Sequence, residues 1–425
     1  MHQSQREVSP AEVFDDLESA VRSYCRQWPA VFDRALGSWL YDASGRPYLD
    51  FFSGAGSLNY GHNNPMIKRP LLEYLASDRV VHSLDMFTVA KRDFLSTFDE
   101  VILRPRDLDY RVQFPGPGGA NAVEAALKLA RKATGRTEVI CFTDGFHGMT
   151  LGALAVSVSA KRSTAGGTPR RHAIPLPFSD CGDHGLPDLS WFDRVLASNG
   201  SEGAEPAAVI VETVQGEGGV NPARLDWLRE VATWSRRHGV PLIVDDVQMG
   251  CGRTGPFFSF EAAGIEPDIV CLSKSLSGYG LPLALTLIRE DLDVWEPGEH
   301  SGTFRGFNPA LITGTAALDA YWRDDALEHG TIAKGTHIET TLRALADAVG
   351  SQVIEVRGRG MIQGVVFADG DLAARVVAEA FDRGLLVETA GPQDEVIKLL
   401  PPLTITDEEL QRGLALLADA VLSVC

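Results

Sequence analysis

The sequence predicts an α/β protein with a large domain built on a mostly parallel sheet and a smaller α+β domain at the C-terminal end. Two observations favour this fold class. From about residue 66, short apolar runs alternate with stretches whose apolar residues recur at helical spacing. Two of those runs end on chemically useful residues, Asp245 and Lys274. Buried strands separated by helices are typical of parallel sheets, whose carboxyl ends open onto a ligand crevice.

Residues 1–65 are predicted to form an N-terminal segment that packs with the small domain. Apolar residues from Val13 to Tyr24 recur at helical spacing, which predicts a helix over residues 11–28. Short strand-like pieces are expected to follow at residues 31–32, 39–41 and 48–52.

Residues 66–315 are predicted to form the large domain. A glycine-rich turn opens into a helix over residues 119–134, and an amphipathic helix covers residues 225–238. Strands are expected at residues 138–142, 207–212, 241–245, 268–273 and 283–288. The polar stretches 157–169 and 179–203 are predicted to be mostly loops.

Residues 316–425 are predicted to form the small α+β domain. A long helical stretch runs from residue 311 to about residue 349, and residues 353–357 and 361–367 read as a hairpin. The remaining expected elements are a helix at 371–384, strands at 385–387 and 396–400, and a helix at 406–424.

Composition and charge narrow the class of protein. Of the 425 residues, 44% are hydrophobic and 23% charged, as in an ordinary globular protein, and the formal net charge is −18. So acidic a chain repels nucleic acid and anionic membranes. We expect a cytoplasmic protein, because the first residues lack the features of a signal peptide and no run approaches a membrane span. The cysteines include no C-x-x-C pair, so no structural metal is expected.

Lys274 and Asp245 are the strongest candidates for chemistry. A lone lysine at the end of an apolar strand suggests an amine that reacts with carbonyls, although it could be a surface lysine. Asp245 and its neighbour Asp246 could merely cap a following helix. Together, however, Lys274 and Asp245 would meet at one rim of the sheet. Pyridoxal phosphate needs a lysine for its aldehyde and an acid for its ring nitrogen, so the pair favours that cofactor.

The turn at residues 114–119 precedes a helix, and free N–H groups at such a helix start bind phosphate. The same glycines could serve only a tight turn. The pattern is not G-x-G-x-x-G after a strand, so a dinucleotide fold is not expected. The loop at residues 300–306 also offers a hydroxyl that could reach a phosphate.

Three further positions follow strand ends. Phe146 could stack on a planar cofactor ring, or it could be a core residue beside a satisfied loop histidine, His147. Glu212 and Glu217 could position substrate amines or pair with a mobile arginine, or they could be ordinary charges at a strand end.

Taken together, these segments resemble the class III, ω-amino-acid aminotransferases of the fold-type I pyridoxal phosphate enzymes, which have a seven-stranded, mostly parallel sheet. The closest resemblance is to the diaminobutyrate–2-oxoglutarate transaminase family known from ectoine biosynthesis. The likeness runs from about Leu17 to the C-terminal domain. It includes LNYGHNNP, VHSLDM, FPGP, NAVEAALKLARK, GFHGMTLGALAV, VETVQGEGG, GCGRTG, SKSLSGYGLP, GTFRG and KLLPPLTI.

The resemblance implies a cofactor site. Lys274 should form the Schiff base with the cofactor and, once released, move a proton between substrate and cofactor. Asp245 should pair with the pyridinium nitrogen, and Gln248 should touch the ring hydroxyl. Phe146 should stack on the cofactor ring, and His147 and Glu212 are also implied to bind the cofactor. The N–H groups of Gly119 and Ala120 should hold the phosphate, together with Thr303 of a neighbouring subunit.

The substrate side is implied in the same way. Glu217 should be the gate between the two half-reactions. Lys398 stands where relatives carry an arginine, and a lysine there favours the diaminobutyrate branch over ornithine or GABA enzymes. Gly118 and Ala120 replace threonines, which removes hydroxyl donors while leaving backbone donors. The chain also departs from the family in residues 157–169 and in three bulkier residues, Phe87, Met249 and Phe307.

We therefore predict a homodimeric aminotransferase with shared active sites, which could pair further into a tetramer. Glutamate would give its amino group, through pyridoxal phosphate, to L-aspartate 4-semialdehyde, yielding L-2,4-diaminobutyrate and 2-oxoglutarate. Transfer to another ω-aldehyde or terminal amine is an alternative within this class. A pyridoxal phosphate aminomutase or racemase is a second alternative, and a non-catalytic binding protein that keeps the fold is a third.

Overall fold

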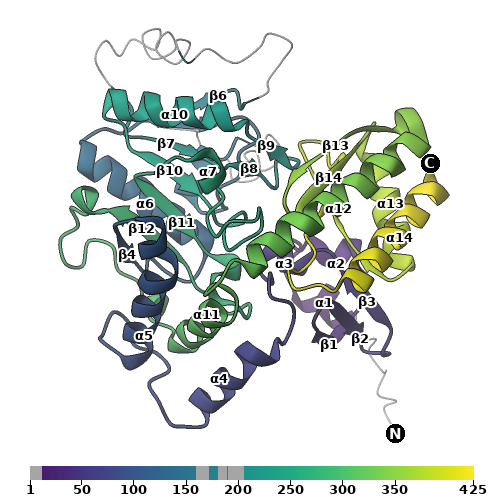
Figure 1. Cartoon of the computed structure of the whole chain (residues 1–425), viewed down its shortest axis with the longest axis horizontal. Helices are drawn as coiled ribbons and strands as arrows, with labels where there is room; N and C mark the ends of the chain where they lie inside the picture. Colours follow the sequence, from purple (N-terminus) through teal and green to yellow (C-terminus); the bar gives the residue numbers. More distant parts are fainter. Residues whose placement is uncertain (1–11, 159–171, 180–188, 190–204) are drawn as a thin grey trace, which may run out of the picture.

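The computed structural model describes residues 12–158, 172–179, 189 and 205–425. They form two lobes joined side by side, a larger one around a central sheet and a smaller one that contains the C-terminus (Figure 1). The stretches predicted as loops at residues 157–169 and 179–203 fall largely outside the described residues, as does the start of the chain.

The larger lobe is built on a seven-stranded sheet with the order β4-β12-β11-β10-β7-β5-β6. Neighbours from β11 to β6 are parallel, and β12 is antiparallel to both β11 and β4. The predicted α/β class with a mostly parallel sheet is therefore confirmed. The strands are β4 (Tyr110–Gln113), β5 (Val139–Phe142), β6 (Ala173–Leu176), β7 (Ala208–Val211), β10 (Leu242–Asp245), β11 (Ile269–Leu272) and β12 (Leu285–Arg289).

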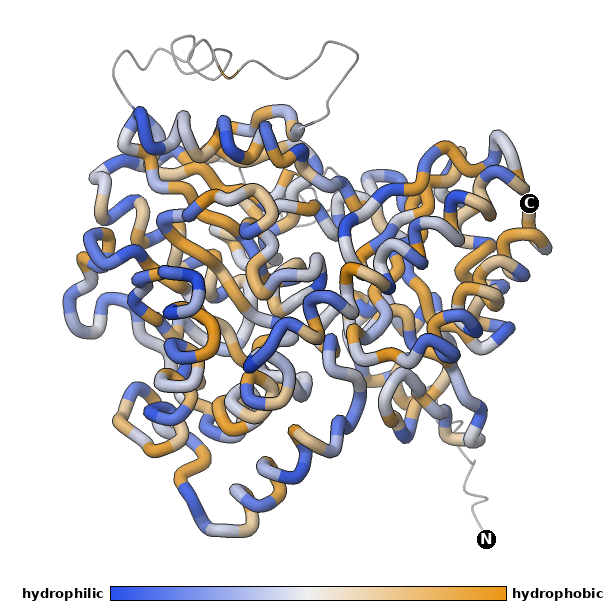
Figure 2. The backbone as a smooth tube through the Cα atoms, in the orientation of Figure 1, coloured by the Kyte–Doolittle hydropathy of each residue, from blue (hydrophilic) through white to orange (hydrophobic). Residues whose placement is uncertain are grey.

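The central strands form because nearly every side chain in them is apolar. β5 and β7 are buried along their whole length, and the same holds for β10 and β11. Helices with one apolar face cover the sheet, and Figure 2 shows hydrophobic strands beneath helices with more hydrophilic segments. The helices of this lobe are α4 (Pro65–Leu75), α5 (Val89–Phe98), α6 (Gly119–Thr134), α7 (Leu151–Val156), α10 (Leu225–His238) and α11 (Asn308–Tyr321).

The smaller lobe contains a four-stranded antiparallel sheet with the order β13-β14-β17-β16. Its first two strands form the predicted hairpin. The sheet strands are β13 (Val353–Arg359), β14 (Ile362–Phe367), β16 (Glu388–Ala390) and β17 (Val396–Leu399). The helices are α12 (Ala326–Val349), α13 (Gly370–Asp382) and α14 (Asp407–Val424).

The N-terminal segment joins the smaller lobe through a second sheet. Its strands β1 (Phe32–Leu36), β2 (Trp39–Asp42) and β3 (Pro47–Asp50) pair in order, and β3 also pairs in parallel with β15 (Leu385–Leu386). Leu49 and Phe51 belong to the same apolar core as the helices of the smaller lobe. The predicted domain boundaries at residues 65 and 315 stay a prediction.

Two helix predictions need correction. Residues 11–28 do not form one helix but two short ones, α1 (Glu12–Leu17) and α2 (Tyr24–Gln27). Leu17 and Val21 are both more than four-fifths exposed, so no packed apolar face stabilises a longer helix. The long helical stretch to residue 349 is broken between α11 and α12, where Trp322 leaves the helical path and its indole N–H donates to the Tyr60 hydroxyl.

No helix among the described residues is both long and apolar enough to cross a membrane. The larger lobe and the smaller lobe have separate apolar cores. Arg253 is fully buried where they meet, and its guanidinium donates to the carbonyls of Met361 and Pro401 and to Oδ1 of Asn59. This arginine therefore ties segments of both lobes together beside the site described next.

Candidate active site

The two central residues predicted from the sequence lie at the carboxyl edge of the large sheet. Asp245 is the last residue of β10, and its neighbour in the parallel register is Cys271 of β11. Lys274 follows β11 by two residues and begins a short 3-10 helix, Lys274–Ser277. The predicted convergence of the two strand ends at one rim is therefore present in the structure.

A single cavity at this rim joins residues from distant parts of the chain. Lys274 and Asp245 both line it. The other lining residues are Gly119, Ala120, Phe146, His147, Gly148, Glu212, Glu217, Val247, Gln248 and Met249. The cavity thus gathers every residue predicted for the site except Thr303 and Lys398.

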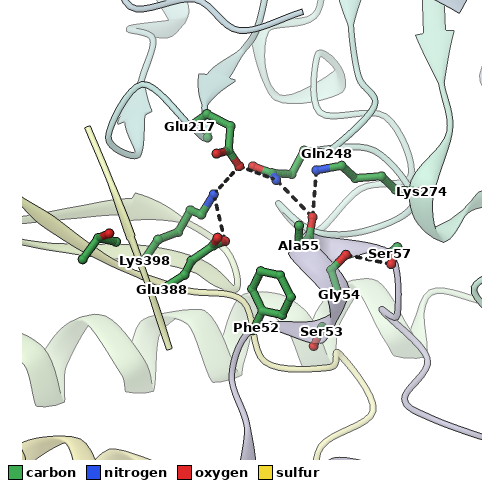
Figure 3. Close-up of polar contacts among 12 residues, drawn as sticks. Phe52, Ser53, Gly54, Ala55, Ser57, Glu217, Gln248, Lys274, Glu388 and Lys398 are labelled. Atoms are coloured by element: carbon green, nitrogen blue, oxygen red, sulfur yellow. Dashed lines mark hydrogen bonds and ion pairs between the residues drawn. The ribbon is translucent and has the colours of Figure 1, made fainter. Parts of the chain in front are cut away.

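Lys274 has an unusual backbone and a buried amine. Its φ of 48° lies in the left-handed region, which residues with a side chain seldom adopt and which occurs often at functional sites. Its Nζ donates to the carbonyl of Ala55 at 2.7 Å (Figure 3). Burial lowers the pKa of Lys274 to about 8, an effect that the charge of Glu217 opposes. Part of the amine is therefore neutral, and nucleophilic, near neutral pH.

The Ala55 carbonyl reaches the cavity because the backbone before it turns sharply. Ser53, Gly54 and Ala55 all have φ between 50° and 57°, within the short helical segment α3 (Ser53–Gly56). Left-handed conformations are strained for residues with a Cβ. The N-terminal segment therefore adopts a strained backbone conformation, and this conformation brings the Ala55 carbonyl towards the amine of Lys274.

Asp245 is held by a buried histidine. Nδ1 of His147 lies 2.7 Å from Oδ2 of Asp245, and both side chains are almost fully buried. Burial lowers the pKa of His147, but the hydrogen bond and charge of Asp245 outweigh that effect and raise the pKa overall. The hydrogen bond to His147 therefore fixes the orientation of the Asp245 carboxyl group. No helix follows Asp245, so the alternative role as a helix cap is excluded.

Asp246 does not enter the cavity. It is buried on the other side of the chain, where it accepts hydrogen bonds from the backbone N–H and the hydroxyl of Ser259. Burial raises the pKa of Asp246 to about 7. Its task is structural, because it holds the loop that follows β10.

Glu212 supports the aromatic residue. Its Oε2 accepts from the backbone N–H of Phe146 at 2.9 Å, and burial raises the pKa of Glu212 to about 7. Phe146 is half-buried and lines the cavity, where its ring can face a planar ligand. The structure therefore gives Glu212 a supporting role at the edge of the cofactor cavity.

The start of α6 forms the other end of the cavity. Gly118 N–H donates to Oδ1 of Asn121, while the N–H groups of Gly119 and Ala120 lie in the first turn, where a helix offers no acceptor of its own. A Cβ on Gly119 would lie 2.7 Å from Val247 Cγ1. Only glycine therefore fits there, and the backbone can approach a phosphate closely.

Gln248 provides a direct indication that a ligand is needed. Its Nε2 donates to the Ala55 carbonyl at 3.1 Å and, more weakly, to Oε1 of Glu217 at 3.5 Å. Its Oε1 is buried and has no hydrogen-bond partner among the described residues. Buried acceptors are nearly always satisfied, so this oxygen fits the hydroxyl of a bound ring. The amine, the carboxylate, the helix start and this acceptor together fit pyridoxal phosphate.

Lys398 lies behind the cavity on β17 and is fully buried. Its Nζ donates to Oε1 of Glu217 at 2.7 Å and lies 3.1 Å from Oε1 of Glu388 (Figure 3). Burial lowers the pKa of Lys398, but the charges of the two acids outweigh burial and raise it above its usual value. The lysine therefore stays protonated and places an ammonium group between two carboxylates behind the cavity.

Thr303 does not line the cavity of its own chain and is exposed, so its predicted role at the phosphate of a neighbouring subunit stays a prediction. Of the three bulky departures from the family, only Met249 lines the cavity. Phe87 is fully exposed, and Phe307 packs against the apolar core of the larger lobe. The departure at residues 157–169 falls mostly outside the described residues.

Sequence reasoning missed three features of the site: the Ala55 carbonyl, the pairing of His147 with Asp245, and Glu388. The first two depend on contacts between distant segments, which no local pattern reveals. Glu388 did leave a signal, because it is a lone acid between apolar residues in the run Leu385–Ala390. An acid in such a strand needs a buried partner.

Comparisons with known proteins agree with this geometry. The family model for class III aminotransferases matches residues 21–421. The chain is 58% identical over 410 residues to the diaminobutyrate–2-oxoglutarate transaminase of Streptomyces avermitilis, covering 96% of this chain and 97% of that protein. It is 59% identical over 409 residues to the protein of the same name from Streptomyces anulatus, with the same coverage.

Among solved structures, an ornithine aminotransferase from Toxoplasma gondii superposes with a TM-score of 0.84 at 26% identity, covering 97% of this chain and 93% of that one. That structure is described as having partial occupancy of pyridoxal phosphate at its active site. Both the sequence match and the fold extend over almost the whole chain. The chain belongs to the class III aminotransferases.

Proposed function

We propose that the protein is a pyridoxal phosphate-dependent aminotransferase that moves an amino group from L-glutamate to L-aspartate 4-semialdehyde. The products are L-2,4-diaminobutyrate and 2-oxoglutarate, and the reaction is reversible. The observation that carries the proposal is the presence of Lys274 and Asp245 in one cavity of a chain that is 58% identical to a diaminobutyrate–2-oxoglutarate transaminase. We place the reaction in the cytoplasm.

The cofactor would be held by groups that already face the cavity. Asp245, supported by His147, would hold the ring nitrogen in its protonated form. Gln248 would accept from the ring hydroxyl, and the N–H groups of Gly119 and Ala120 would bind the phosphate. When bound, pyridoxal phosphate supplies the electron sink that stabilises negative charge on the amine-bearing carbon.

Lys274 would move the proton. Its Nζ has a pKa of about 8, so near neutral pH it can accept a proton as an amine and donate one as an ammonium. The Ala55 carbonyl accepts from Nζ and limits where the side chain can point. The residue therefore combines a tuned pKa with a fixed position.

Lys398 would receive a carboxylate of the substrate after Glu217 has turned away from it. In the structure Glu217 is paired with Lys398, and an aldehyde or amine substrate can leave this ion pair intact. When Glu217 turns away from Lys398, a dicarboxylate substrate can bind there. One carboxylate of the substrate then takes the place of the Glu217 carboxylate. Such an exchange lets one cavity serve both half-reactions.

We also propose a homodimer in which Thr303 reaches the phosphate of the opposite subunit. An apolar surface supports this assembly. His82 Nε2 hydrogen-bonds the Thr303 carbonyl, and next to this contact Met86, Phe87 and Phe304 are exposed by more than half. Exposed apolar patches of this kind mark protein interfaces. Sedimentation of the purified protein should give the mass of two chains or a multiple of it.

The function is tested by incubating the purified enzyme with glutamate and aspartate semialdehyde and measuring diaminobutyrate. A screen of other terminal amines in the reverse direction tests the substrate range. Formation of 2-oxoglutarate together with diaminobutyrate supports the proposal. Conversion of a single amino acid without any oxo-acid partner would instead indicate an aminomutase or racemase.

A further inference from the structure

Glu388 is a buried acid to which the proposed reaction assigns no task. It lies directly opposite Lys398 in the antiparallel register of β16 and β17, and only 2% of its surface is exposed. Its Oε1 lies 3.1 Å from Lys398 Nζ, which forms an ion pair between the two side chains. Because Lys398 also hydrogen-bonds Glu217, one ammonium group is shared between two carboxylates (Figure 3).

The two carboxylates differ in their freedom to move. Glu217 lies on a turn between Gly216 and Gly218, lines the cavity and has a side chain that is 12% exposed. Glu388 lies within a strand, does not line the cavity and has a side chain that is 3% exposed. An incoming carboxylate can therefore displace Glu217 from Lys398, whereas Glu388 stays in place.

The charged groups that act on Glu388 come from three other elements. Lys398 on β17 and Lys274 after β11 favour its carboxylate form, while Glu217 on the turn after β8 opposes it. Burial is the largest influence, and together these effects raise the pKa of Glu388 to about 7. A substrate carboxylate that binds Lys398 in place of Glu217 adds a negative charge to the cavity, because Glu217 still lines the same cavity. The added charge favours the protonated form of Glu388 still more.

We propose that Glu388 determines how well the site accepts dicarboxylates: its carboxylate form opposes a second anion at Lys398, and it takes up a proton when a dicarboxylate binds there. This inference rests on the proposed aminotransferase function, in which glutamate and 2-oxoglutarate are the dicarboxylates. An amine or aldehyde substrate that leaves Glu217 paired with Lys398 does not require the proton.

The test uses the cofactor-loaded enzyme and glutarate, a dicarboxylate with neither an amino nor an oxo group, so that binding is measured without turnover. Calorimetric titration in two buffers of different ionisation enthalpy counts the protons taken up. We expect uptake near neutral pH and an affinity that falls as the pH rises from about 6 to about 8.5, because the acid then loses its proton.

The variant Glu388→Gln should abolish this proton uptake and flatten the pH dependence. At about pH 8.5 it should bind glutarate roughly three- to tenfold more tightly than the unchanged enzyme, since a fixed negative charge has been removed. Glu388→Asp keeps an acid and should keep the uptake. Glu379→Gln is a matched control, because Glu379 pairs with Arg383 on the surface of α13.

Cofactor content and thermal unfolding show whether each variant is folded, and Glu388→Met, which also removes the acid, replaces Glu388→Gln if that variant is not folded. Proton uptake that persists in Glu388→Gln would overturn the inference. Weaker glutarate binding by that variant at every pH would overturn it too, since Glu388 would then merely hold Lys398 in place. An enzyme that binds glutarate as expected but transfers no amino group would overturn the proposed function alone.

Discussion

The two ends of the cavity are built in different ways. The cofactor end consists of residues at or just after the ends of parallel strands in one sheet, above all Asp245 and Lys274. The substrate end is assembled across the two lobes, from Glu217 of the larger lobe and from Lys398 and Glu388 on adjacent strands of the smaller lobe. At the first end the geometry is fixed by the sheet, whereas at the second it depends on how the lobes meet.

This difference indicates where each property of the enzyme resides. The cofactor end is positioned by the sheet and contains an amine whose pKa is lowered by burial, which suits chemistry that is the same for every substrate. The proposed substrate end is a cluster of buried charges in which Glu217 is the most exposed member, which suits the choice between substrates. Changes at the cofactor end should therefore reduce turnover for all substrates, and changes at the substrate end should affect substrates unequally.

The largest effect is expected from Lys274→Ala. Without an amine to move the proton, turnover should fall by roughly 10⁴-fold or more with every substrate. Steady-state rates and the visible absorbance of the bound cofactor check this prediction. An unchanged rate would contradict the claim that Lys274 at the cofactor end is required for turnover.

Asp245→Asn should reduce turnover by about 10²- to 10³-fold, because the neutral amide cannot hold a protonated ring nitrogen. His147→Asn, which removes the support of Asp245 and leaves the acid, should cost about tenfold. Both losses should be equal for the diamine and for glutamate. A loss confined to one substrate would show that the two ends of the cavity are not separate in function.

Lys398→Met should act on one half-reaction. The KM for glutamate and for 2-oxoglutarate should rise about 10- to 100-fold, while the KM for the diamine changes little. The variant also leaves two buried carboxylates without a cation, so the free energy of unfolding should fall by about 3–5 kcal/mol at pH values where both are ionised. Half-reaction rates and denaturant titration measure the two effects, and equal changes in both KM values would contradict the comparison.

The smallest effect links the two ends. Glu217 raises the pKa of Lys274 against the lowering effect of burial, so Glu217→Gln should move that pKa below about 8. The pH at which half of the amine of the cofactor-free enzyme reacts with pyridoxal phosphate should therefore fall. Rapid-mixing absorbance over a range of pH measures the shift, with Glu379→Gln as the control. An unchanged midpoint pH would mean that the charge of Glu217 does not affect the pKa of Lys274.

The cofactor end was predictable from the sequence for a physical reason. A run of apolar residues identifies a buried strand, and the residue that follows it must lie at the sheet edge, so Asp245 and Lys274 could be placed without any contact being known. The helix at residues 119–134 could also be predicted from local sequence signals. It starts at a glycine-rich turn and ends at Gly135, whose backbone is left-handed.

The rest depended on long-range packing. The Ala55 carbonyl lies 219 residues from Lys274 in the sequence, and its left-handed backbone has no local signature at an alanine. Glu388 was recognisable only as an acid in an apolar run, and its partner became visible when β16 and β17 paired. The single helix expected at residues 11–28 failed for the same reason, because periodicity does not show whether an apolar face finds anything to pack against.

The most direct test of the account is to bind pyridoxal phosphate to the enzyme, reduce the linkage with borohydride and locate the modified lysine by mass spectrometry of its peptides. We predict that Lys274 alone is modified and that Asp245→Asn leaves the position of the label unchanged. Modification of Lys398 or of a surface lysine instead, with Lys274 unlabelled, would contradict the claim that these two strand ends form the cofactor site.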